Sequence, residues 1–80
     1  MEASLDTKDK IEKIIYKVLY QYMVELKSIK STKILIDKVL EETLKMEITI
    51  SEKNIKQIIN ELKNEKKIRF GQEEGWRIWI

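Results

Sequence analysis

The chain has 80 residues, of which 42% are apolar, so it is long enough for one small hydrophobic core and too short for two. It has no Cys and no His, which excludes disulfides, zinc-finger sites and thiol or imidazole catalysis. Its 16 Lys and Arg nearly balance its 14 Asp and Glu at a net charge of +2, so any contact with nucleic acid depends on where the charges lie.

The first predicted element is an amphipathic helix over about residues 8–26, preceded by a flexible N-terminus over residues 1–7. We expect Asp6 or Thr7 to be its N-cap. Apolar residues recur along it at intervals of three and four, at Ile11, Ile14, Ile15, Val18, Tyr22 and Leu26. This spacing predicts one buried face.

The apolar arc of this helix is wider than one buried face, because further large side chains continue round its flank, at Tyr16, Leu19, Tyr20 and Met23. This flank is either an interface with a second copy or a partner protein, or it is covered by the same chain. The covering segment would be the C-terminal hairpin, residues 1–7 or the loop at residues 28–33. Soluble monomers seldom expose such a patch, so we expect a homodimer or heteromer built through it.

Two shorter helices follow. Ser31 or Thr32 is placed to cap a second helix over about residues 33–45, and Ser51 is placed to cap a third helix that runs to about residue 65. Residues at helical spacing supply the buried sides, which are Leu35, Ile36, Val39, Leu40, Thr43 and Leu44 in the second helix and Ile55, Ile58, Ile59 and Leu62 in the third. The segment between the two helices contains no Gly.

After residue 65 the apolar period changes from about 3.6 residues to about 2, which predicts strands over residues 66–70 and 76–80 joined by a five-residue loop over residues 71–75. Pairing Phe70 with Trp76 sets Arg69 opposite Arg77 and Lys67 opposite Trp79 on the outward face. The core face is then formed by Ile68, Phe70, Trp76, Ile78 and Ile80. A slip of one residue would exchange the two faces.

A helix, two helices joined by a short turn and a Gly-containing hairpin, in this order, resemble the winged helix-turn-helix domain. The most specific part is residues 50–70, ISEKNIKQIINELKNEKKIRF, which are similar to the family's third helix running into the first strand of its wing. The resemblance covers about residues 10–80 and implies one mostly helical α+β domain over residues 1–80, a three-helix bundle with a C-terminal two-stranded wing. Family members are mostly transcription regulators, and some relatives bind proteins instead.

Polar residues lie opposite the apolar face of the third helix, in a stripe that is almost free of acids. Gln and Asn can pair with adenine in the major groove, and Lys can reach guanine or phosphates, so the stripe suits a recognition helix. We expect the DNA-binding residues to be Lys53, Lys56, Gln57, Asn60, Asn64, Lys67, Arg69 and Arg77. The alternative is an ordinary solvated helix face.

The charges of the hairpin permit two interpretations. Arg69 directly opposite Arg77 is repulsive unless an anion lies between them, and a phosphate is the natural candidate. The alternative is a solvated cationic face on which Trp79 stacks against Lys67. Two carboxylates in the loop, Glu73 and Glu74, are either a soluble turn or a barrier to entry into the minor groove.

These features predict a cytoplasmic, non-enzymatic protein that binds double-stranded DNA as a small transcriptional regulator or architectural factor. The alternative is a winged-helix protein-interaction module or accessory subunit. No cofactor, metal, small-molecule substrate or membrane insertion is expected, because the chain has only two Gly and no apolar stretch long enough to span a bilayer. The abundant Lys, Glu and Ile match hyperthermophile proteins, archaeal ones included, and an AT-rich genome gives the same bias.

Overall fold

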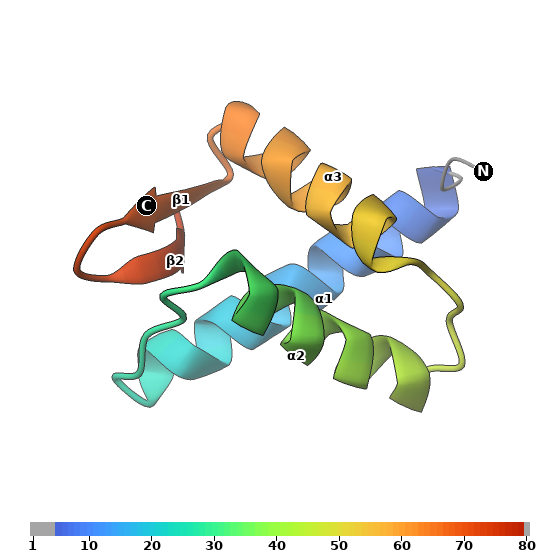
Figure 1. The fold of residues 1–80 in the computed structure, drawn as a ribbon, viewed down its shortest axis with the longest axis horizontal. Coiled ribbons are helices and arrows are strands. Elements are labelled where there is room, and N and C mark those ends of the chain that lie inside the picture. Colours follow the sequence, from blue (N-terminus) through green and yellow to red (C-terminus); the bar gives the residue numbers. More distant parts are fainter. Residues whose placement is uncertain (1–4, 80) are drawn as a thin grey trace.

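A computed structural model describes residues 5–79 of the protein. It has three helices followed by a two-stranded antiparallel hairpin (Figure 1). The elements are α1 (Leu5–Val24), α2 (Thr32–Lys45), α3 (Glu52–Asn64), β1 (Ile68–Gly71) and β2 (Gly75–Ile78). This mostly helical α+β order confirms the predicted fold class and is consistent with a winged-helix arrangement.

The second and third helices begin where the sequence predicts. The hydroxyl of Ser31 accepts a hydrogen bond from the backbone N–H of Lys33, and the hydroxyl of Ser51 accepts one from that of Asn54, each at 3.2 Å. The first helix begins at Leu5, so Asp6 and Thr7 lie inside its first turn and the prediction that either is the N-cap is wrong. The rest of the predicted flexible N-terminus, residues 1–4, lies outside the described residues.

Each helix ends with a non-glycine residue in the left-handed region, at Leu26, Glu47 and Lys66. The next residue closes the turn in each case by donating its N–H back to the last turn of the helix, to the carbonyl oxygens of Tyr22, Thr43 and Leu62 at 2.8, 2.9 and 2.9 Å. This is the Schellman arrangement, in which Gly is the usual residue. Glu47 therefore turns the chain between α2 and α3 without a glycine.

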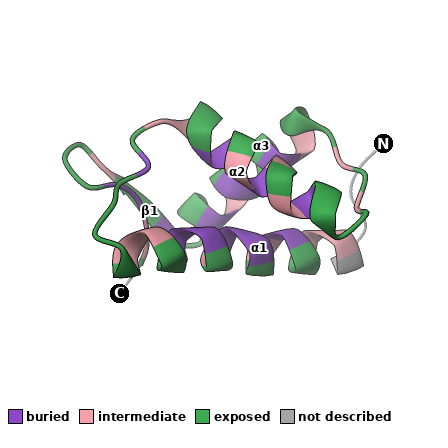
Figure 2. Ribbon diagram, turned by 90° about the horizontal axis from the view of Figure 1, so that it is seen from below, coloured by how far each residue is buried: buried purple, intermediate pink, exposed green. Residues whose placement is uncertain are grey.

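The core lies where α1 crosses behind α2 and α3 (Figure 1). Figure 2 shows the buried residues of α1 on the side toward the other helices and its exposed residues on the opposite side. The core is aliphatic apart from one Trp, and its described members are Ile11, Ile14, Ile15, Val18, Leu19, Ile29, Leu35, Ile36, Val39, Ile55, Ile58, Ile59, Leu62, Ile68 and Trp76. In the part of the chain described, no helix is both long and apolar enough to cross a membrane.

The hairpin has the predicted register, with Phe70 opposite Trp76 and Arg69 opposite Arg77. Gly71 and Gly75 also pair, so the turn between the strands is shorter than the predicted five residues. The prediction that Phe70 belongs to the core is wrong, because the side chain is 43% exposed and contacts Trp76 edge-on with a 5.2 Å distance between ring centroids. Ile78 is partly buried, and the prediction for Ile80 falls outside the described residues.

The hairpin also contacts the loop before α2, which the sequence did not reveal. The backbone N–H of Trp76 donates to the carbonyl oxygen of Ile29 at 2.8 Å, and Ile29 forms an isolated bridge with Gly75. Gly75 has a φ of +74°, and a Cβ there would lie 2.2 Å from the same carbonyl oxygen. Only a glycine allows the loop and β2 to approach this closely.

The flank of α1 is largely covered by the same chain. Leu19 is completely buried, so the prediction that it is exposed at an interface is wrong. Tyr16 and Met23 are partly buried, and strand β2 packs along this helix. Of the four predicted interface residues, Tyr20 remains exposed. That the other three side chains are not exposed agrees with the predicted alternative, in which the hairpin covers this flank.

We expect Gly75→Ala to destabilise the protein by roughly 3 kcal/mol or more, because the new methyl group meets the Ile29 carbonyl and the residue is strained at positive φ. Gly71→Ala is the matched control, since the nearest atoms to its Cβ lie at an ordinary 3.6 Å. The measurement is urea denaturation of both variants. Equal losses would contradict the contact between β2 and the loop.

We expect Trp76→Ala to cost about 3 to 5 kcal/mol of stability and Trp79→Ala far less, because Trp76 is 6% exposed and Trp79 is 50% exposed. Thermal and urea denaturation of the two variants measure the difference. A larger loss at Trp79 would show that the two faces of the hairpin have been exchanged.

Candidate nucleic-acid interface

One face of α3 is apolar and buried, and the opposite face is polar and exposed. The buried residues are Ile55, Ile58, Ile59 and Leu62. Opposite them lie the exposed Lys53, Gln57, Asn60 and Asn64. Glu61 borders this stripe, and its carboxylate pairs with Lys8 of α1 at 2.9 Å. The stripe therefore combines amide and ammonium groups without a carboxylate in its centre.

The stripe continues toward α2 through Lys56, which lies one turn after Lys53 on the flank that faces this helix. A shallow hollow of about 460 Å³ between the two helices is lined by Lys53 and Lys56 of α3 and by Lys33 of α2, and Glu52 is its acidic member. The first turn of α2 contains no acidic residue. Three lysines and a helix N-terminus thus border one hollow, a combination that attracts anions.

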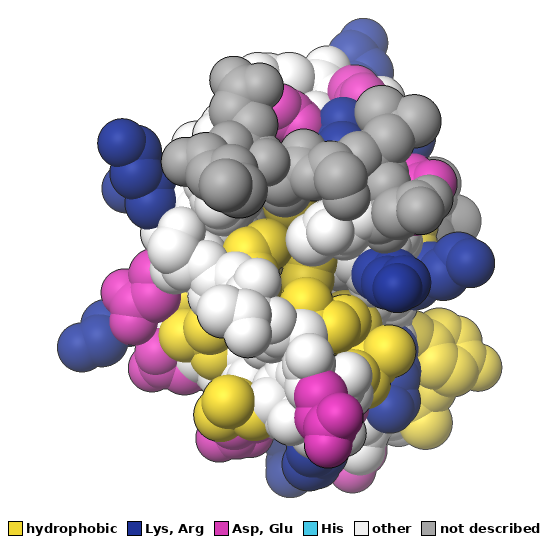
Figure 3. All heavy atoms as spheres, turned by 90° about the vertical axis from the view of Figure 1, so that its right-hand side faces the viewer, with side chains coloured by type: hydrophobic (Ala, Val, Ile, Leu, Met, Phe, Trp, Pro, Cys, Tyr) yellow, Lys and Arg dark blue, Asp and Glu magenta, His cyan; other side chains and the backbone are white. Residues whose placement is uncertain are grey.

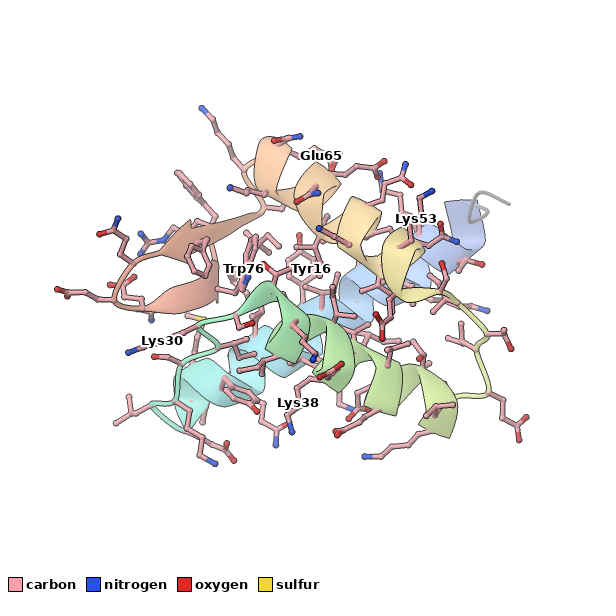
Figure 4. All side chains as sticks on the ribbon, in the orientation of Figure 1. Tyr16, Lys30, Lys38, Lys53, Glu65 and Trp76 are labelled. Atoms are coloured by element: carbon pink, nitrogen blue, oxygen red, sulfur yellow. The ribbon has the colours of Figure 1, made fainter. Side chains whose placement is uncertain are left out.

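Trp76 fixes the hairpin against both helices of this surface. Its indole N–H donates to the hydroxyl of Thr32 at the start of α2, at 3.3 Å. The ammonium group of Lys63, near the end of α3, lies 6.0 Å from the centre of the indole ring. Figure 4 shows Trp76 where the hairpin meets the helices, with Lys53 at the start of α3 and Lys30 in the loop before α2.

The lysines of this surface differ from most others in having no ion partner. Several lysines on α1 and on the outer side of α2 are paired with carboxylates, as in Lys17 with Glu42 at 3.3 Å and Lys38 with Glu41 at 3.8 Å. No ion pair with any described residue is formed by five exposed lysines near the start of α2 and along α3: Lys30, Lys33, Lys53, Lys56 and Lys63. The surface therefore carries cations whose charge the protein does not neutralise.

Three of these lysines were missed at the sequence level. Lys63 lies seven residues after Lys56, so helical spacing alone places it on the same flank. Lys33 follows the Ser31 cap and could have been assigned to the first turn of α2. Lys30 carries no such signal, because its position depends on the contact between Ile29 and the hairpin.

The predicted cations of the hairpin are already paired. The ammonium group of Lys67 lies 3.3 Å from Glu12 of α1 and 3.6 Å from Glu65, and its pKa is raised mainly by the hydrogen bond to Glu12. The anion between Arg69 and Arg77 is a carboxylate of the protein itself. One oxygen of Glu74 lies 2.9 Å from Arg69 and 3.4 Å from Arg77.

The structure brings together the predicted site residues of α3, and it places the hairpin residues apart from them. Side chains alternate across a strand, so Arg69 and Arg77 lie on the hairpin face opposite Trp76, whereas Lys63 lies against Trp76 itself. Lys67 reaches toward α1. The candidate interface is therefore α3 with the start of α2, and the arginine pair is a separate feature.

A second surface feature lies at the end of the molecule where α2 passes into the loop before α3. Leu44 is 76% exposed and Met46 is 54% exposed, and three more apolar side chains beside them are partly exposed, namely Leu40, Ile48 and Ile50. Figure 3 shows hydrophobic side chains gathered on this end. Exposed apolar side chains that gather on one surface can mark a contact surface.

Comparison of the chain with protein-family models, with curated proteins and with solved structures gave no match.

Proposed function

We propose that the protein binds double-stranded DNA through α3 and the start of α2, as a small transcriptional regulator or architectural factor. The observation that carries this proposal is the group of five lysines around the amide stripe of α3 that form no ion pair with any residue the structure describes. Unpaired cations on one surface attract a polyanion, and a duplex offers a regular array of phosphates.

The amides provide the means of reading sequence. An α-helix fits the major groove, where the side chain of Gln or Asn can pair with the N6 and N7 edge of adenine. Gln57 and Asn60 are exposed on consecutive turns of the same stripe and are suited to this contact. In helix-turn-helix proteins the second helix of the motif occupies the groove, which corresponds to α3 here.

The lysines provide affinity rather than sequence preference. Lys53 and Lys56 lie beside the amides, and Lys33 lies across the hollow on α2, so a helix in the groove would bring them to the flanking phosphates. Neutralising these phosphates releases counterions, and binding must therefore weaken as salt is added.

Replacing Lys53 and Lys56 together by Ala should weaken binding to all duplexes and reduce the salt slope by about two units. Gln57→Ala or Asn60→Ala should mainly reduce sequence preference, by about 1 to 3 kcal/mol. Fluorescence anisotropy with duplexes of random and selected sequence measures both. Lys10→Ala with Lys13→Ala on α1 is the control, since it removes the same charge from exposed residues without ion partners among the described ones. Absence of duplex binding at low salt would refute the proposal.

A protein-interaction role is the second candidate, and the apolar end at Leu44 and Met46 favours it. We expect Leu44→Lys with Met46→Lys to leave the fold intact, because both side chains are mostly exposed, and to abolish any self-association of the wild type. Sedimentation velocity over a wide concentration range measures this. A wild type that remains monomeric throughout would remove self-association from consideration.

A further inference from the structure

We propose that Arg69 and Arg77 form a second contact for the phosphates of the duplex, and that Glu74 occupies this contact in the free protein as a competing anion. The inference rests on the proposed DNA binding. It adds a way in which DNA binding is regulated, because the carboxylate of Glu74 must leave the arginines before a phosphate can take its place.

The register of the hairpin creates the site. Arg69 and Arg77 are directly paired across the strands, and two like charges in such a pair repel each other. One carboxylate oxygen of Glu74 lies between them, 2.9 Å from Arg69 and 3.4 Å from Arg77. Carboxylate and phosphate are the two anions that arginine binds best, and each offers oxygens to its N–H groups. Glu74 therefore occupies the position that suits a phosphate oxygen.

The turn directs Glu74 to this position. Glu74 directly precedes Gly75, where the second strand begins, and its carboxylate folds back over Gly71. A Cβ at Gly71 would lie 3.6 Å from both the Cβ and a carboxylate oxygen of Glu74. Glu73, one residue earlier in the same turn, is exposed and makes no ion pair with any residue in the described range. The two acids of the turn therefore have different surroundings.

A phosphate can replace the carboxylate of Glu74 at the two arginines. Glu74 and Arg69 are exposed and Arg77 is partly exposed, and exposed ion pairs contribute little to stability. Arg69, Arg77 and Glu74 together retain one positive charge, so a phosphate is attracted even while Glu74 is in place. A hollow of about 220 Å³ beside Arg77 and Glu74 offers room to an entering anion and is also bordered by Lys27, Ser28 and Glu73. Lys27 pairs with Glu25 at 3.5 Å, so Ser28 is the further donor of this hollow that is not in an ion pair.

The remaining cation of the hairpin does not share this arrangement. Lys67 pairs with Glu12 of α1 and with Glu65 at the end of α3, and these contacts join elements of the fold. Within the described range, the ion pairs of Glu74 are with residues of the hairpin itself. Its removal should leave the rest of the structure unchanged.

We expect Glu74→Gln to raise the affinity for a random-sequence duplex by about threefold to tenfold at low salt, because it removes the competitor and keeps the shape of the side chain. Glu73→Gln removes the same charge from the same turn and should raise the affinity by less than about twofold. Arg69→Ala with Arg77→Ala should weaken binding. In the variant that lacks both arginines, Glu74→Gln should raise the affinity for the duplex no more than Glu73→Gln does. This comparison completes a double-mutant cycle.

Fluorescence anisotropy with one labelled duplex measures all these affinities, and thermal denaturation verifies that each variant is folded. Equal gains from Glu74→Gln and Glu73→Gln, or a loss from Glu74→Gln, would overturn the inference while the wild type still binds DNA. If neither the wild type nor Glu74→Gln binds duplex at low salt, the proposed function fails and the inference fails with it.

Discussion

The candidate interface depends on the contacts that hold Trp76 in position. Its backbone N–H bonds to Ile29 at 2.8 Å, its indole N–H bonds to Thr32 at 3.3 Å, and Lys63 lies over its ring. One residue therefore joins the hairpin to the loop before α2 through its backbone, and to the first turn of α2 and the end of α3 through its side chain. Gly75 makes the arrangement possible, because any side chain there would push the loop away.

The distribution of ion pairs explains how a chain with a net charge of only +2 presents a cationic surface. Acids such as Glu42 on α2 are paired with lysines of α1 and α2, so these charges cancel locally. The pKa of Glu42 is lowered mainly by its hydrogen bond from Lys17, as expected for a carboxylate that is paired with a cation. The lysines along α3 and at the start of α2 have no such partner among residues 5–79. Net charge alone therefore underestimates the attraction of this surface for a polyanion.

The sequence predicted the parts of the structure that depend on local pattern. Helical spacing gave α3 and its polar stripe, and strand alternation gave the pairing of Phe70 with Trp76. Predictions failed where a distant segment decides the outcome. Leu19 is buried in a core to which the hairpin contributes Ile68 and Trp76, and the role of Ile29 depends on a contact with β2. Pattern alone cannot show such contacts, since the residues lie far apart in the chain.

The acidic turn of the hairpin is the feature for which the sequence was least informative. Glu73 and Glu74 together suggest a turn that repels DNA, yet the structure separates them by position, since Glu74 alone lies between the two arginines. In the proposed mechanism, the carboxylate of Glu74 competes with phosphates for the two arginines, and the turn holds it next to them. Salt weakens the binding of a duplex through the release of many counterions, whereas the contact within the hairpin involves only three charges at short range. Glu74 lowers the positive charge that the phosphates meet, and its own attraction to the arginines is also screened as salt rises. The same residue that lowers affinity at low salt should therefore make the dependence of binding on salt less steep.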